Sequence, residues 1–206
     1  MATVITKTEG ENLTHRVLWQ CCLRQIEIAR STEKGRKYFD LTAMLMAYFA
    51  YEAYLNFVGS RVAAADWADE RTFFRKPPYQ GTEGKLQRIV EVCGLPAIAK
   101  GARPYQTIAL LAELRDLIAH AKPERYELEV EHPAGKERPM FGPYRLEKLV
   151  SVELAERAIA DVEEFAEMIH KAARHKVTDG WFGDAPFRGL LGYATHSSTV
   201  TGRGDR

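Results

Sequence analysis

Three side chains near the middle of the chain have the types and the spacing for acid–base chemistry on a phosphate. Arg115, Asp116 and His120 lie within the stretch RDLIAH. A guanidinium stays charged and binds two phosphate oxygens at once. An imidazole, with a reference pKa of about 6.5, exchanges protons near neutral pH. We therefore interpret Arg115 as a phosphate clamp and His120 as an acid or base, with Asp116 orienting the imidazole from four residues upstream.

A helix over residues 107–121 must position these three side chains. Pro104 stands at a tolerated first-turn position, and Pro123 ends the pattern just beyond His120. At about 100° per residue, the polar residues share one arc and the apolar residues the opposite one. The predicted core face consists of Leu110, Leu111, Leu114, Leu117, Ile118 and Ala121.

A second helix, over residues 41–65 with Asp40 as its N-cap, is apolar almost all the way round and is expected to be central. Glu52 and Asn56 lie one turn apart within its apolar stripe. A carboxylate there needs a partner, because burying it alone is costly. Arg115 is the predicted partner, although Glu52 could equally anchor a neighbouring helix or a backbone amide.

The remaining pattern predicts a mainly α fold, a bundle of four to five helices with a small β-hairpin before the last long helix. Alternating residues from Tyr126 predict the first strand of that hairpin, and YRLEKLV its second. Ser151 caps the last helix. The expected divisions are a flexible lead-in at 1–11, the helical domain at 12–176 and a partly disordered tail at 177–206, docked through Trp181, Phe182 and Phe187.

Composition narrows the function classes. A net charge of +1 leaves nucleic-acid binding to a local basic site. Three cysteines without zinc spacing, and no apolar run long enough to span a membrane, favour a cytoplasmic protein without a metal site or cofactor. Walker, GxSxG and HExxH motifs are absent from the sequence. Among the other histidines, His15 is expected at the surface of the first helix, and His170 and His175 in solvated roles.

RDLIAH at the end of an apolar helix resembles the Arg-x4-6-His signature of the HEPN superfamily, and AYFAYEAYLNFVG resembles that family's second helix. The resemblance covers residues 12–176 in the order and type of elements. It implies a small helical bundle, often dimeric, of a family in which many members are metal-independent ribonucleases of toxin–antitoxin or phage-defence systems. Arg115 and His120 match the signature, and Glu52 matches an acidic position. Asp116 departs from the asparagine or histidine often found there.

The expected function is therefore a metal-independent endoribonuclease. His120 would act as the acid or base in attack by the RNA 2′-hydroxyl, leaving a 2′,3′-cyclic phosphate and a 5′-hydroxyl. One histidine fills one of the two proton-transfer roles at a time, so the resemblance implies a homodimer that brings two His120 residues together. Lys122 and Arg125 would extend a basic groove for RNA. An antitoxin protein is a further expected partner. The alternative is a non-catalytic HEPN module that binds nucleotide or RNA, or a dimeric interaction domain.

Overall fold

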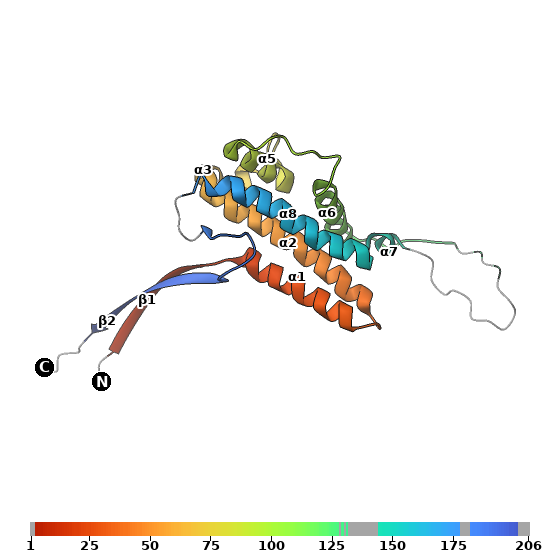
Figure 1. Cartoon of the computed structure of the whole chain (residues 1–206), viewed down its shortest axis with the longest axis horizontal. Coiled ribbons are helices and arrows are strands. Elements are labelled where there is room, and N and C mark those ends of the chain that lie inside the picture. Colours follow the sequence, from red (N-terminus) through yellow and green to blue (C-terminus); the bar gives the residue numbers. More distant parts are fainter. Residues whose placement is uncertain (1–2, 128, 130, 132–143, 178–181, 202–206) are drawn as a thin grey trace.

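The computed structural model describes residues 3–127, 129, 131, 144–177 and 182–201, and these form a mainly helical protein (Figure 1). The prediction of a mainly α, bundle-like fold is confirmed. One pair of strands, β1 (Thr3–Asn12) and β2 (Gly192–Thr201), joins the two ends of the chain. The helices are α1 (Thr14–Ser31), α2 (Arg36–Val62), α3 (Ala64–Ala68), α4 (Glu70–Phe73), α5 (Gly81–Cys93), α6 (Tyr105–Ala119), α7 (Arg145–Leu149) and α8 (Val152–Arg174).

The centre of the bundle is α2, as its nearly all-apolar sequence predicts. It packs against α1, α5, α6 and α8, and Figure 1 shows α1, α2 and α8 running side by side. The predicted start of this helix is wrong. Asp40 is not an N-cap: the helix begins at Arg36, after Gly35 in a left-handed conformation, and Asp40 lies buried inside it. The Arg36 guanidinium, 3.6 Å from the Asp40 carboxylate, makes that burial tolerable.

The two helices that flank α2 bury regular apolar stripes. In α1 the stripe is His15, Trp19, Cys22, Ile26 and Ala29, residues spaced three or four apart. In α8 the predicted N-cap is confirmed, because the Ser151 hydroxyl accepts a hydrogen bond from the Leu154 amide at 3.2 Å. The apolar face of α8 buries Ala158, Val162, Phe165 and Ile169 against the centre of the bundle.

The core face of α6 differs from the predicted one. Leu111 and Leu114 are fully buried as expected, but Ile118 is exposed and so is Ala121, which lies beyond the helix. The buried face instead begins at Thr107 and Ile108. The helix therefore packs through its first three turns and lets its last turn project from the bundle. That projection explains why the final apolar residue reaches solvent.

The predicted hairpin is wrong in its second strand, because residues 145–149 form the short helix α7. Of the first strand, Tyr126 and Glu127 are not in a strand, and most of the remainder lies outside the described residues. The sheet is built elsewhere: β1 and β2 pair antiparallel from Thr3 opposite Thr201 to Asn12 opposite Gly192. Figure 1 shows this two-stranded ribbon extending away from the helices, with both termini at its far end. The lead-in and the tail are thus partners of one another.

The chain between α8 and β2 docks on the bundle. Phe182 and Phe187 are buried, which confirms the predicted docking for these two residues, whereas Trp181 lies outside the described residues. The Phe187 ring stacks on Trp19 of α1 with 4.3 Å between centroids. Across the described ranges, no helix combines the length and the apolarity needed to cross a membrane.

Candidate functional site

The predicted partnership between α2 and α6 is present. Arg115 Nη2 donates to Glu52 Oε1 at 3.0 Å, and the Thr82 hydroxyl of α5 donates to the same oxygen at 2.5 Å. Both charged side chains are partly buried, with 34% of Arg115 and 25% of Glu52 exposed. Glu52 thus joins three helices through one carboxylate oxygen. This contact fixes the position of the guanidinium relative to the core.

A second carboxylate and an aromatic ring complete the surroundings of Arg115. Its Nη1 lies 2.6 Å from Asp116 Oδ1, and its guanidinium carbon lies 5.7 Å from the centre of the Tyr48 ring. Burial works against the charge on Arg115, but the hydrogen bond and charge of Glu52 outweigh it and raise the pKa. Burial, with a contribution from the Glu52 carboxylate, raises the pKa of Tyr48 to about 12. At neutral pH Arg115 is therefore a cation and Tyr48 a neutral phenol.

His120 lies just beyond α6, at the C-cap position. Its backbone N–H donates to the Asp116 carbonyl at 3.0 Å, which closes the last turn. Its side chain is exposed and makes no hydrogen bond or ion pair with a described residue. The expected side-chain contact from Asp116 is absent, because the Asp116 carboxylate binds Arg115 instead. The imidazole is accordingly accessible to a ligand, and none of the described residues orients it.

Lys122 and Arg125, the predicted continuation of a basic groove, are exposed immediately after α6. Neither forms an ion pair with a described residue. Together with His120 they place cationic or titratable groups along the segment that leaves the helix.

Asn56, predicted to support the site, belongs to a separate polar junction. Its Oδ1 accepts hydrogen bonds from Lys85 Nζ at 2.8 Å and from Trp67 Nε1 at 3.4 Å. Lys85 also pairs with Glu70. These contacts tie α2 to α3, α4 and α5, and none of them reaches Arg115. The contacts of Asn56 are those of a residue that holds the bundle together.

Several buried polar residues escaped the sequence analysis. His15 and His170, expected at the surface, are only 2% and 3% exposed, and Arg16 is 4% exposed. Burial, followed by the charge of Arg16, lowers the pKa of His15 to about 3. The signal that could have revealed His15 is its position on the apolar stripe of α1. The buried Asp161 was also missed; Arg103 binds it through two nitrogens, with Nε to Oδ2 at 2.9 Å.

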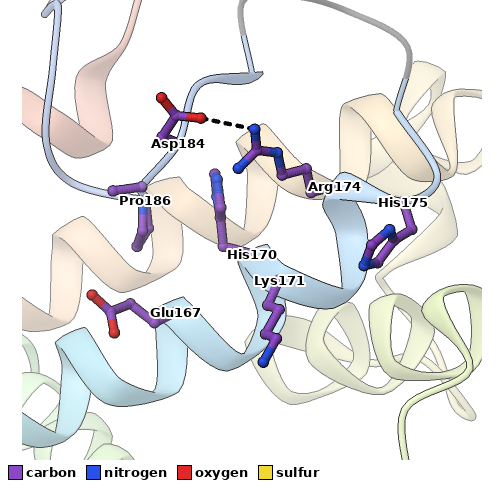
Figure 2. A pocket seen from close by; sticks show the side chains of 8 residues that line it. Glu167, His170, Lys171, Arg174, His175, Asp184 and Pro186 are labelled. Carbon is purple, nitrogen blue, oxygen red and sulfur yellow. Dashed lines mark ion pairs between the residues drawn. The ribbon is translucent and has the colours of Figure 1, made fainter.

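A cavity of about 550 Å³ lies between the end of α8 and the docked C-terminal segment (Figure 2). Three of its polar side chains have partners among the described residues, whereas no described residue bonds to the side chain of Glu167, Lys171 or His175. His170 bonds the Tyr54 hydroxyl at 3.0 Å and the Gly183 carbonyl at 3.3 Å, and Arg174 pairs with Asp184 at 2.8 Å. Figure 2 shows Lys171 extending away from Asp184. The contacts of His170 with Gly183 and of Arg174 with Asp184 hold the C-terminal segment against α8.

No protein-family model, curated protein or solved structure matches this chain. The described residues also contain no cluster of histidine, cysteine and carboxylate side chains that could hold a metal ion. The candidate site is therefore defined by its own geometry: a guanidinium fixed by Glu52, and an exposed imidazole about one helical turn further along the chain.

Proposed function

We propose that the protein is a metal-independent endoribonuclease and that the end of α6 is its active surface. The observation that carries the proposal is the pairing of a fixed cation with an exposed imidazole: Glu52 holds Arg115, and His120 follows one turn later. The resemblance of RDLIAH to the HEPN signature agrees with this arrangement. A toxin–antitoxin or phage-defence role is the biological setting that the resemblance implies.

The chemistry needs only groups of these types. The RNA 2′-oxygen loses its proton to a base and attacks the phosphorus, while the bond to the 5′-oxygen breaks and that oxygen gains a proton from an acid. Arg115 would stabilise the added negative charge on the phosphoryl oxygens. His120 can serve as the base or the acid, and the products are a 2′,3′-cyclic phosphate and a 5′-hydroxyl.

A second copy of the chain would supply the second histidine. One copy exposes a single His120 without orienting it, and Ile118 on the same projecting turn is 37% exposed, an apolar side chain that a neighbouring copy could cover. A two-fold axis beside α6 would bring two His120 side chains to one cleft. Lys122 and Arg125 would then flank that cleft from both copies.

One observation favours the second candidate, a non-catalytic module that binds RNA or nucleotide or acts as a dimeric interaction domain. Two carboxylates, Glu52 and Asp116, already contact the Arg115 guanidinium. A phosphate must therefore compete with Asp116 for Nη1. If that competition fails, Arg115 fastens α6 to α2, and ligands meet only His120 and the exposed cations after it.

The deciding experiment is cleavage of mixed RNA in EDTA by the wild-type protein, His120→Ala and the control His196→Ala. His196 is an exposed histidine on β2, where it bonds the Thr8 hydroxyl at 2.9 Å. Cleavage by wild type and His196→Ala alone, with cyclic-phosphate ends, supports the proposal. Equal cleavage by all three proteins removes His120 from the chemistry. Binding of RNA without cleavage by any of them supports the non-catalytic module.

A further inference from the structure

The most unusual charge in the protein is that of Arg16, on the first turn of α1. Its side chain is buried, yet it forms no ion pair with any described carboxylate. Its hydrogen bonds go to backbone oxygens of the docked C-terminal segment: Nη1 to Leu190 at 2.8 Å, Nη2 to Ala185 at 3.1 Å and Nε to Pro186 at 3.4 Å. Carbonyl dipoles satisfy donors but do not neutralise a cation, so the positive charge remains uncompensated.

The position of Arg16 along α1 increases this imbalance. The N-terminal end of a helix carries a partial positive charge, which disfavours a cation there and favours an anion. The first turn of α1 has no acidic residue and no side-chain cap. Burial accordingly lowers the pKa of Arg16. The Arg16 guanidinium and the N-terminal end of α1 therefore both contribute positive potential at this place. No described carboxylate pairs with Arg16 there.

A cavity of about 420 Å³ opens over this point. Arg16 lines it together with Arg188, an exposed residue of the C-terminal segment whose guanidinium pairs with Glu163 at 2.9 Å. Three N–H groups of the Arg16 guanidinium are used by the carbonyls, so two of its five donors remain without a described partner. The volume lies within the range of small-molecule pockets.

The segment that lines the cavity has backbone N–H groups without a described partner. Its carbonyls at residues 183, 185, 186 and 190 bond to His170 or Arg16, whereas none of the N–H groups of residues 183–190 donates to a described residue. Gly183 and Gly189 both have positive φ, and a Cβ at Gly183 would lie 2.8 Å from Arg16 Nη2. Glycines thus let the backbone approach the guanidinium closely. Unpaired N–H groups in such turns form anion-binding concavities.

We propose that this cavity binds the phosphate group of a small phosphate ester. A phosphate offers several acceptor oxygens and up to two negative charges, which match two arginines and backbone N–H groups that have no partner among the described residues. The remaining volume admits a substituent on the ester. Among the described residues that line the cavity, Asp184 supplies the single carboxylate, which is largely exposed and paired with Arg174. This site is separate from the end of α6 and does not depend on ribonuclease activity.

Calorimetric titration at fixed ionic strength tests the proposal with inorganic phosphate, adenosine monophosphate and adenosine. Phosphate and the monophosphate should bind saturably, whereas adenosine should not. Arg188→Gln should weaken binding of the monophosphate about fivefold, and Asp184→Asn should strengthen it about twofold, because both substitutions change a charge at the surface of the cavity without touching the core. The matched control is Arg24→Gln, an exposed arginine on α1, which should bind as wild type does.

Arg16→Gln should abolish binding, but it also removes buried contacts, so the two surface variants decide the matter. The proposal is overturned if wild type binds no phosphate, if adenosine binds as well as its monophosphate, or if Arg188→Gln and Arg24→Gln behave alike. Loss of binding in His120→Ala with normal binding in Arg188→Gln would assign the phosphate to the end of α6 and would also overturn it. RNA cleavage is not part of this readout, so the two proposals fail independently.

Discussion

The end of α6 and the cavity over Arg16 place an arginine in opposite electrostatic settings. Arg115 lies between the carboxylates of Glu52 and Asp116, with 34% of its side chain exposed. Arg16 is buried and meets only backbone oxygens. A carboxylate supplies a full countercharge, whereas a carbonyl supplies only a dipole. The charge of the first arginine is therefore balanced by carboxylates, and in the proposed mechanism a phosphate must compete with Asp116 for it. The second is unbalanced, so the fold depends on its contacts and an anion is favoured beside it.

The largest stability effect should come from Arg16. Arg16→Met should lower the free energy of unfolding by about 3 kcal/mol, because one buried and two partly buried hydrogen bonds to carbonyls are lost and the C-terminal segment loses its anchor on α1. Urea denaturation gives the value. The control Arg24→Met removes an exposed arginine that pairs only within α1, and it should change stability by less than about 0.5 kcal/mol. Equal losses in the free energy of unfolding for the two substitutions would show that the Arg16 contacts stabilise the fold no more than an exposed ion pair does.

Acid should destabilise the same region. Burial, with the charge of Arg16, lowers the pKa of His15 to about 3, against about 6.5 in the unfolded chain. Between these values the unfolded chain binds a proton that the folded protein does not. The stability is therefore complete above pH 6.5 and falls as the pH drops, by about 2 kcal/mol between pH 7 and pH 5.

Urea denaturation at several pH values measures this dependence. His15→Phe should reduce its slope by the equivalent of one proton without flattening it, since burial also lowers the pKa of His170. An unchanged slope in His15→Phe would mean that His15 does not control the acid response.

Some of these contacts could be predicted from the sequence and others could not. The sequence predicted Arg115 as the partner of Glu52 because a carboxylate within an apolar stripe needs one, and it left open that Glu52 anchors a neighbouring helix. The structure shows both contacts, to Arg115 on α6 and to Thr82 on α5. Arg16 and the ribbon of β1 and β2 could not be foreseen in the same way. Their partners lie about 170 to 200 residues away in sequence, and local patterns carry no information on such pairings. His15 was an intermediate case. It lies on the apolar stripe of α1, which the sequence shows, but its polar side chain was expected to face solvent and is buried.

The ion pair between Glu52 of α2 and Arg115 of α6 should contribute less to the free energy of unfolding than Arg16 does. A double-mutant cycle with Glu52→Gln and Arg115→Gln should give a coupling of about 1 kcal/mol in the free energy of unfolding, since both side chains are partly buried and bond directly. The exposed pair Arg24 and Glu27 is the matched control, with an expected coupling of about 0.3 kcal/mol. A coupling at α6 no larger than that of the control would mean that Glu52 does not hold Arg115 in solution.

Asp116 should matter least. Its carboxylate is 62% exposed and contacts Arg115, not the His120 ring. Asp116→Asn should therefore change the free energy of unfolding by less than about 0.5 kcal/mol and the RNA cleavage rate by no more than about threefold. A loss of cleavage of about a hundredfold would instead restore Asp116 to the orienting role that its spacing from His120 suggests.

The most direct test of the account measures stability and RNA cleavage together in His120→Gln. Because the His120 side chain is exposed and has no described partner, the free energy of unfolding should stay within about 0.5 kcal/mol of wild type. Because glutamine cannot exchange a proton, cleavage in EDTA should fall by at least about a hundredfold. Unchanged stability with lost cleavage is the predicted result. Unchanged cleavage would contradict the assignment of the end of α6 as the active surface.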